Sequence, residues 1–295
     1  MKILITGAGG LLGSKISYLL LKKNYEVYAA YLTHIPSYGL PIKLDISNEK
    51  MVFKIIKDIN PDAIFHCAAL TDVDKCEINK EIAKRINIDG TKFIAKIAKK
   101  INSHLIYIST DYVFDGSKGM YKEEDEPNPI NFYGYSKLLG EKIIEKIEGE
   151  YLIARTSVIY GSKPASGKTN FALWILDNLN KGQNIKVLID QYVSPTLNTN
   201  LAEMLIEAYE RKLTGIYHLA GAERVSRYEF ALKLAEIFNL NKNLIIKAKM
   251  DEMNWIAKRP KDTSLDVSKA NNVFKVKPIN LNEALNNLKE ELKIA

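Results

Sequence analysis

Three side chains between residues 110 and 137 could together move a proton onto a small molecule. Thr110 follows an apolar run at 104–108, and Tyr133 and Lys137 have the spacing Tyr-x-x-x-Lys at the start of a helical pattern, 137–147. Four residues make about one helical turn, so the phenol and the ammonium group can share a face. A nearby positive charge lowers a phenol pKa that is normally about 10. The spacing predicts Tyr133 as an acid and Thr110 as its partner on the substrate oxygen, although surface helices also carry such a spacing.

A glycine-rich turn near the N-terminus predicts a bound dinucleotide. An apolar strand, Lys2–Thr6, runs into the sequence GAGGLLG and then into an amphipathic helix, Leu11–Lys22. Gly7, Gly10 and Gly13 suit a tight turn whose backbone approaches a pyrophosphate and packs closely on the strand. The N–H groups and the dipole at the start of the helix also favour phosphate.

The next expected strand, Glu26–Tyr31, bears on which dinucleotide is bound. A site for NAD usually ends this strand with a carboxylate that binds the ribose hydroxyls. Here the strand ends Ala-Tyr-Leu-Thr-His, with neither a carboxylate nor an arginine. We therefore favour NADPH as the cofactor and keep NADH as an alternative.

Two later strand ends supply further candidates for cofactor contacts. Asp45 closes a short strand, where it could accept a hydrogen bond from the adenine amino group or cap a helix at 48–58. Ala68 and Ala69 follow a strand at 63–67, and small residues there let the chain pass beside the cofactor. With four His and no spaced set of ligands, the sequence predicts no metal site.

The order of these elements predicts the fold. A helix at 80–100 and a strand at 104–108 continue the alternation of strands and helices, which calls for a doubly wound parallel sheet. We expect an α/β, Rossmann-like fold with a smaller α/β lobe that binds the substrate. The NAD(P)-binding domain should span 1–160 and the lobe mainly 161–295, with the chain returning to the first domain around 190–220.

Composition limits the classes of partner. The 295 residues include 42 Lys and Arg against 35 Asp and Glu, and the basic residues are spread along the chain rather than clustered. This pattern predicts neither a nucleic-acid patch nor a membrane partner. With two Cys and no apolar run of membrane length, we expect a cytoplasmic protein.

Taken in one order, these motifs resemble the extended short-chain dehydrogenase/reductase family. The stretch STDYVFDG, the sequence YGYSK and the later pieces RTS, GIYH and YEFA resemble its dTDP-4-dehydrorhamnose reductase branch nearly end to end. The resemblance implies an NAD(P)H-dependent reductase of a nucleotide-linked 4-keto-6-deoxy sugar, with dTDP-4-dehydrorhamnose converted to dTDP-L-rhamnose.

The resemblance also implies roles for individual residues. Tyr133 would protonate the alkoxide, Lys137 would bind the nicotinamide ribose and polarise Tyr133, Thr110 would hold the substrate carbonyl, and Asp111 would contact the sugar. The implied cofactor contacts are the pyrophosphate with Gly10, Leu11 and Leu12, the adenine with Asp45 and Ile46, and the ribose side with Cys67, Ala68 and Ala69.

A second family resemblance leaves an alternative of another class. The regulatory β subunit of methionine adenosyltransferase carries a similar STDYVFDG and YG-x-x-K signature, which would make this chain a cofactor-binding partner of methionine adenosyltransferase. Nucleotide-sugar dehydratases are set aside because Tyr112, not a glutamate, follows Asp111.

Some residues differ from the family pattern, and others have a role that the sequence does not decide. Val158 stands where bacterial rhamnose enzymes have a tryptophan, and Lys15 stands where some relatives have a magnesium-binding glutamate. Lys15 argues against a metal-bridged dimer, while a homodimer of another kind stays open. Arg224, Arg227 and Arg259 could attract a nucleotide-sugar diphosphate or lie in solvent.

Overall fold

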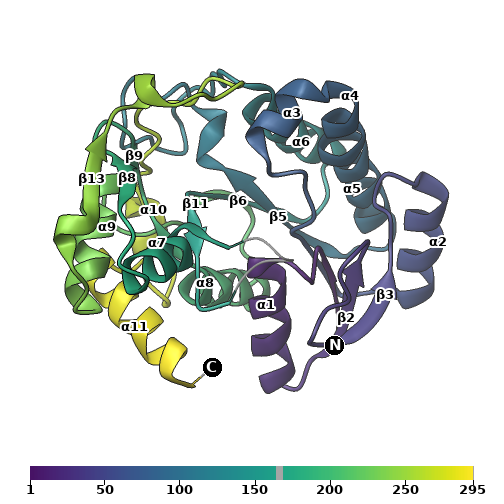
Figure 1. The fold of residues 1–295 in the computed structure, drawn as a ribbon. Coiled ribbons are helices and arrows are strands. Elements are labelled where there is room, and N and C mark those ends of the chain that lie inside the picture. Colours follow the sequence, from purple (N-terminus) through teal and green to yellow (C-terminus); the bar gives the residue numbers. More distant parts are fainter. Residues whose placement is uncertain (164–168, 295) are drawn as a thin grey trace.

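The computed structural model describes residues 1–163 and 169–294 and is built around a seven-stranded parallel sheet (Figure 1). The strand order is β11-β6-β5-β4-β1-β2-β3, so the order reverses between β1 and β4. In sheets of this kind, ligands bind outside the carboxyl ends of the strands at the point of reversal. The strands are β1 (Lys2–Thr6), β2 (Glu26–Tyr31), β3 (Leu40–Lys43), β4 (Ala63–His66), β5 (His104–Thr110), β6 (Tyr151–Thr156) and β11 (Gly215–His218).

Helices cover both faces of the sheet because successive strand side chains point to opposite sides. Ile3 and Ile5 pack with α1 (Leu11–Lys22), α8 (Asn198–Glu210) and α10 (Ser268–Val273). Leu4 and its neighbours on the other face pack with α2 (Glu49–Ile59), α5 (Thr91–Lys100) and α6 (Phe132–Ile147). Strands buried on both faces are typical of a doubly wound sheet, and the expected fold class is confirmed.

A smaller α/β lobe lies beside the sheet, on the left in Figure 1. Its hydrophobic core is separate from those of the sheet and joins helices to the parallel pair β8 and β13. The elements of this half are α7 (Phe171–Asn180), β8 (Ile185–Leu188), α9 (Arg227–Ile237), β13 (Ile245–Ala248), α11 (Leu281–Ile294) and the short strands β7 (Ile159–Tyr160), β9 (Tyr192–Val193), β10 (Thr196–Leu197) and β12 (Val225–Ser226). Two elements from this half of the chain, β11 and α8, belong to the main sheet instead. β11 pairs with β6, and α8 packs against the sheet.

A π-helical turn interrupts the helix expected at 80–100. The chain forms α3 (Val73–Ile78), α4 (Lys80–Ala83), a π-helical turn at Lys84–Gly90 and then α5. The widened turn contains Asn87, whose buried side chain hydrogen-bonds groups on other segments. Such π turns occur frequently at functional sites.

Two further boundaries near the candidate acid differ from the expectation. The strand expected at 104–108 runs on to Thr110, and the helix expected at 137–147 begins earlier, at Phe132. Asn131 caps this helix, because its Oδ1 accepts a hydrogen bond of 2.9 Å from the N–H of Gly134. Tyr133 therefore lies inside the first turn of α6 rather than before it.

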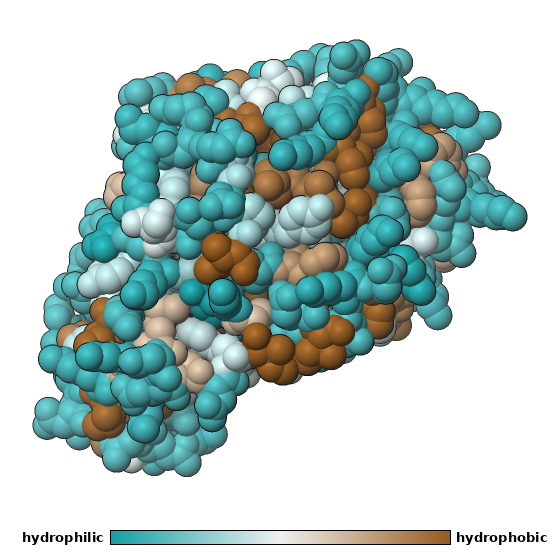
Figure 2. Space-filling view, turned by 90° about the horizontal axis from the view of Figure 1, so that it is seen from above, coloured by the Kyte–Doolittle hydropathy of each residue, from teal (hydrophilic) through white to brown (hydrophobic). Residues whose placement is uncertain are grey.

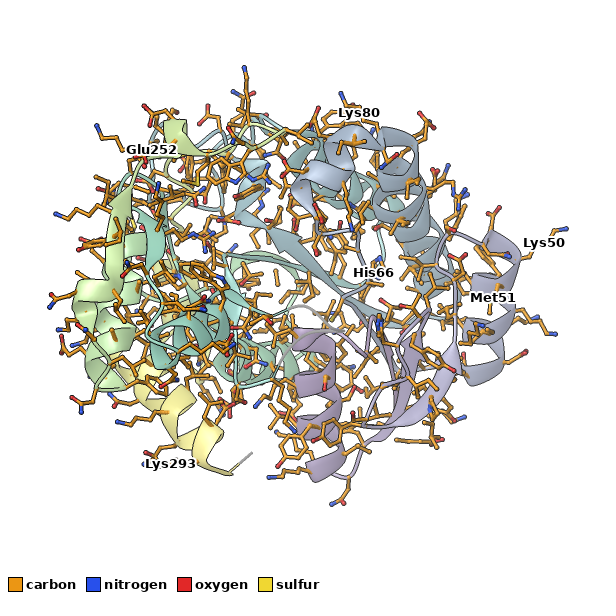
Figure 3. All side chains as sticks on the ribbon, in the orientation of Figure 1. Lys50, Met51, His66, Lys80, Glu252 and Lys293 are labelled. Atoms are coloured by element: carbon orange, nitrogen blue, oxygen red, sulfur yellow. The ribbon has the colours of Figure 1, made fainter. Side chains whose placement is uncertain are left out.

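His66, at the end of β4, lies near the middle of the molecule (Figure 3). Its Nδ1 is 2.7 Å from the hydroxyl of Thr6 on β1, and its Nε2 is 3.2 Å from that of Thr91 on α5. Burial lowers the pKa of His66 to about 3, so the ring is neutral at physiological pH. It joins β1 to a covering helix and is a packed strand residue.

Candidate active site

The glycine turn has the geometry of a phosphate cradle. Gly7 has φ +68°, and a Cβ there would lie 2.9 Å from the backbone of Ala68. A Cβ on Gly13 would collide with the carbonyl of Gly7. The N–H of Gly10 donates to the Gly7 carbonyl at 2.9 Å, and Gly10 is the N-cap residue of α1, which no side chain caps. The first turn of α1 thus keeps N–H groups free of side-chain acceptors, which suits an anion.

The residues expected beside the ribose lie against this turn. Cys67, Ala68 and Ala69 follow β4, and the N–H groups of the first two donate to the carbonyl and the hydroxyl of Thr6, each at 3.2 Å. Burial raises the pKa of the Cys67 thiol to about 12, so Cys67 is a poor nucleophile there. Leu11 and Leu12 lie in the first turn of α1, and an amide N–H of Asn198 on α8 donates to the Leu11 carbonyl at 3.1 Å.

The adenine contacts stay predictions, but one alternative for Asp45 is excluded. Asn48, not Asp45, caps α2, because its Oδ1 accepts from the N–H of Met51 at 3.1 Å. Asp45 instead folds back on Ser47, whose N–H and hydroxyl both donate to its Oδ1 at 2.9 and 2.8 Å. Ile46 is buried beside Gly90 of the π-helical turn.

Thr110, Tyr133 and Lys137 come together where β5 ends and α6 begins. Thr110 is buried at the end of β5, and its hydroxyl is within hydrogen-bonding reach of the Tyr133 phenol. Lys137 follows one turn later on α6 and is 3% exposed. The ring of Tyr112 packs edge-on to that of Tyr133 with centroids 6.0 Å apart. The arrangement provides a hydroxyl, a phenol and an amine beside the cofactor cradle.

The electrostatics of Tyr133 and Lys137 differ from the expectation. Burial raises the pKa of Tyr133 above 10, and the nearby Asp111 charge raises it further, while the hydrogen bond from Thr110 opposes them. Burial also lowers the pKa of Lys137 to about 7, with the charge of Glu141 opposing. The expected lowering of the phenol pKa by Lys137 is therefore wrong, because burial raises the pKa of Tyr133 and Lys137 is not among the groups that act on it most. Tyr133 keeps its proton at neutral pH and can donate it.

Asp111, expected at the sugar, is enclosed by hydroxyl groups. Its carboxylate accepts hydrogen bonds from Ser157 at 2.7 Å, Thr263 at 2.5 Å and Thr110 at 3.0 Å. Burial raises the pKa of Asp111, and these three donors oppose that change. The contacts show Asp111 orienting the Thr110 hydroxyl, and a direct contact with substrate stays a prediction.

Asn87 is a site residue that the sequence reasoning missed. Its Oδ1 accepts from the N–H of Leu70 at 2.8 Å, and its Nδ2 donates to the hydroxyl of Ser136 at 2.9 Å. Ser136 donates in turn to the carbonyl of Tyr133 at 2.8 Å. These bonds join the loop after β4 to the first turn of α6. An uncharged amide within the apolar pattern of a helix is the signal that could have found it.

A buried ion pair between α6 and β6 also went unpredicted from the sequence. Glu141 and Arg155 form an ion pair of 2.7 Å, with side chains 1% and 3% exposed. Ser109 also donates to Glu141, so the hydroxyl next to Thr110 is structural. This contact separates the roles of the adjacent Ser109 and Thr110, because Ser109 donates to Glu141 whereas Thr110 donates to Asp111.

The described residues, 1–163 and 169–294, contain no group of three His, Cys, Asp or Glu side chains arranged to hold a metal ion. Lys15 forms an ion pair of 2.8 Å with Glu291 of α11.

No helix within residues 1–163 and 169–294 has both the length and the apolarity to cross a membrane. Hydrophobic residues instead reach the surface in separate patches, as the face in Figure 2 shows.

Comparison with known proteins identifies relatives over nearly the whole chain. The dTDP-4-dehydrorhamnose reductase of Aggregatibacter actinomycetemcomitans is 34% identical over 98% of this chain and 98% of its own. The methionine adenosyltransferase 2 subunit beta of Xenopus laevis is 32% identical over 91% of this chain and 81% of its own.

A solved structure agrees with the fold and with the reductase resemblance. The dTDP-4-dehydrorhamnose reductase from Bacillus anthracis, in complex with NADP, is 32% identical, covers 98% of this chain and 99% of its own, and superposes with a TM-score of 0.88. The model of the family described as "RmlD substrate binding domain" matches residues 1–294. The chain is therefore a member of the RmlD substrate-binding-domain family.

Proposed function

We propose that this chain is an NADPH-dependent reductase of a nucleotide-linked 4-keto-6-deoxy sugar, with dTDP-4-dehydrorhamnose as the substrate and dTDP-L-rhamnose as the product. The observation that carries the proposal is the meeting of Thr110, Tyr133 and Lys137 beside the glycine turn. Similarity to dTDP-4-dehydrorhamnose reductases over nearly the whole chain supports it.

The cofactor would lie along the carboxyl ends of β1 and β4. Gly7, Gly10 and Gly13 with the first turn of α1 would hold its pyrophosphate, because the turn presents backbone N–H groups and has no Cβ atoms at these three positions. Ala68 would pass beside the ribose. When bound, NADPH supplies the hydride that adds to the keto carbon.

The chain's own groups would handle the oxygen of the keto group. The Thr110 hydroxyl donates its single proton to Asp111 in the structure, and it would have to turn this proton to the keto oxygen to hold the carbonyl in place. As negative charge develops there, Tyr133 would transfer its phenolic proton to the oxygen, which completes the alcohol. A pKa above 10 keeps Tyr133 protonated beforehand, so the acid is ready at neutral pH.

Lys137 would support both the cofactor and the phenol. Its buried amine lies 4.0 Å from the centre of the Tyr107 ring and one turn from Tyr133. Hydrogen bonds to the ribose hydroxyls would offset the loss of water around this amine and favour its charged form. The ammonium charge would then stabilise the phenolate that Tyr133 becomes after it gives up its proton.

NADPH is the preferred cofactor because the end of β2 offers no carboxylate to repel a 2′-phosphate. After Tyr31 the chain continues through Leu32, Thr33 and His34, and the Thr33 hydroxyl contacts the His34 ring at 2.8 Å. Titration of the protein with NADPH and NADH tests this preference. An NADH affinity tenfold higher, about 1.4 kcal/mol, would contradict it.

A regulatory role beside a methionine adenosyltransferase is the second candidate, favoured by the similarity to the subunit beta of that enzyme. Thr110, Tyr133 and Lys137 lie in the STDYVFDG and YG-x-x-K signature that both families carry, so these residues do not decide between the candidates. We prefer the reductase because the similarity to a dTDP-4-dehydrorhamnose reductase extends over 98% of both chains, whereas the similarity to the subunit beta covers 91% of this chain and 81% of the subunit.

One assay separates the two candidates. The purified protein is incubated with dTDP-4-dehydrorhamnose and NADPH, and the loss of nicotinamide absorbance is followed together with identification of the sugar product. Stoichiometric formation of dTDP-L-rhamnose would support the reductase. A protein that binds NADPH, oxidises none of it and forms a stable complex with a methionine adenosyltransferase would favour the regulatory subunit.

A further inference from the structure

Two of the three arginines near the lobe are already neutralised by carboxylates. Arg224 pairs with Asp262 through a contact of 2.7 Å from Nε to Oδ2. Arg259 pairs with Asp74 at 3.1 Å and also donates to the carbonyl of Ala257 at 2.9 Å. Each guanidinium is therefore partly neutralised and would attract an anionic ligand less strongly.

Arg227 differs because its charge is not paired. It begins α9 and is half-buried, yet among the described residues no carboxylate lies within 4.0 Å of its guanidinium. Its Nε donates to Oε1 of Gln191 at 3.2 Å, and its central carbon lies 4.9 Å from the centre of the Phe171 ring. Within that part of the chain, the two terminal nitrogens have no hydrogen-bond acceptor. These nitrogens form a planar fork of unused donors.

Gln191 holds this arginine in place and ties it to the candidate active site. The backbone N–H of Arg227 donates to the Gln191 carbonyl at 3.1 Å, and Nε2 of the buried Gln191 donates to the carbonyl of Pro260 at 3.4 Å. Burial lowers the pKa of Arg227, and the charges of Tyr112 and Asp111, which directly follow Thr110, oppose this change. Arg227 is therefore close enough to Tyr112 and Asp111 to interact with them electrostatically, and both follow the candidate residue Thr110.

An unpaired, half-buried cation is costly unless an anion completes the site. A sugar hydroxyl would satisfy a donor but leave the charge, whereas a phosphate group satisfies both. The guanidinium fork also matches phosphate oxygens in a bidentate way that a lysine cannot reproduce. Asp111 is a poorer partner, because three hydroxyl donors already occupy its carboxylate.

We propose that Arg227, positioned by Gln191, binds the diphosphate of the nucleotide-linked substrate and so fixes the sugar beside Thr110. The inference rests on the proposed function and names the group that recognises the charged part of the substrate. Arg224 and Arg259 serve the structure of the lobe instead.

The test measures ligand binding to the NADPH-saturated protein by calorimetry, with dTDP, thymidine and inorganic pyrophosphate as probes. NADPH occupies the glycine turn, so pyrophosphate cannot report on that site. Arg227→Met should lose about 10- to 100-fold in affinity for dTDP, as expected for charge-assisted hydrogen bonds, while its affinities for thymidine and NADPH stay unchanged. Arg227→Lys should recover only part of the loss. Arg224→Met is the matched control and should bind dTDP like the unaltered protein.

The outcomes separate this inference from the proposed function. Equal dTDP affinity in Arg227→Met and the unaltered protein would overturn the inference, as would a loss of thymidine affinity of the same size. If the unaltered protein binds pyrophosphate through Arg227 but does not bind dTDP, the inference holds and the thymidine nucleotide is wrong. Binding of neither probe to the unaltered protein would overturn both.

Discussion

The amine of Lys137 lies 4.0 Å from the centre of the Tyr107 ring, in a site almost closed to water. The ring face attracts a cation, but burial is the larger effect and holds the pKa of Lys137 at about 7. A lysine at this value is protonated in only a fraction of molecules at neutral pH. At pH 7 the amine of Lys137 is therefore neutral in about half of the molecules.

This pKa makes stability depend on pH. Between pH 7 and 8.5 the unfolded chain, with a lysine pKa near 10.4, binds up to one more proton at Lys137 than the folded chain. The free energy of unfolding should therefore rise with pH over this window, by at most about 1.4 kcal/mol per unit. Urea unfolding of the cofactor-free protein at several pH values measures it, with Lys137→Met as the comparison. Identical slopes in the two proteins would contradict the assignment.

Tyr133→Phe should separate proton donation from binding. The change removes one hydroxyl and keeps the ring, so NADPH affinity should persist while the reduction rate falls about 10²- to 10⁴-fold. Tyr135→Phe is the matched control, because Tyr135 lies on the same helix and is exposed. Turnover near the normal rate in Tyr133→Phe would mean that water or another group supplies the proton.

Gly10→Leu should prevent cofactor binding while the fold persists. A Cβ at Gly10 lies 3.1 Å from the carbonyl of Gly7, a contact that a small shift can relieve, but the larger side chain would extend into the phosphate cradle. Calorimetry with NADPH and a thermal melt together test this. Gly149→Leu is the control, since a Cβ there meets only ordinary contacts with Lys99. Unchanged NADPH affinity in Gly10→Leu would remove the glycine turn from the site.

Arg155→Met should destabilise the protein by about 3–5 kcal/mol, because it leaves the buried Glu141 carboxylate without its cation. Lys181→Met breaks the exposed pair with Asp177 and should change the free energy of unfolding by about 1 kcal/mol or less. Equilibrium denaturation of both variants measures the contrast. Equal effects would mean that burial of the Glu141 pair has little importance.

The sequence predicted the sheet and the glycine turn well, because both depend on local patterns. Lys2–Thr6 and Glu26–Tyr31 are strands with the expected bounds, since buried strands read as apolar runs. The π-helical turn at Lys84–Gly90 could not be predicted in this way. It contains Asn87, whose partners Leu70 and Ser136 lie 17 and 49 positions away in the chain.

The pKa values of the site residues could not be predicted from the sequence either. The spacing of Tyr133 and Lys137 placed the two groups correctly on one helix, but their pKa values depend on burial by segments that no local pattern reveals. For the same reason, the sequence alone could not distinguish the roles of Arg224, Arg227 and Arg259. Their different partners distinguish them only in three dimensions.

The hydroxyl groups around Asp111 have a consequence for the order in which activity can arise during synthesis. Ser157 follows β6 directly, whereas Thr263 is made more than a hundred residues later. A growing chain that has emerged only through Ser157 has the glycine turn, Tyr133 and Lys137, but its Asp111 lacks the Thr263 donor. Tyr133 and Lys137 are therefore synthesised well before Thr263 can complete the hydrogen bonds around Asp111.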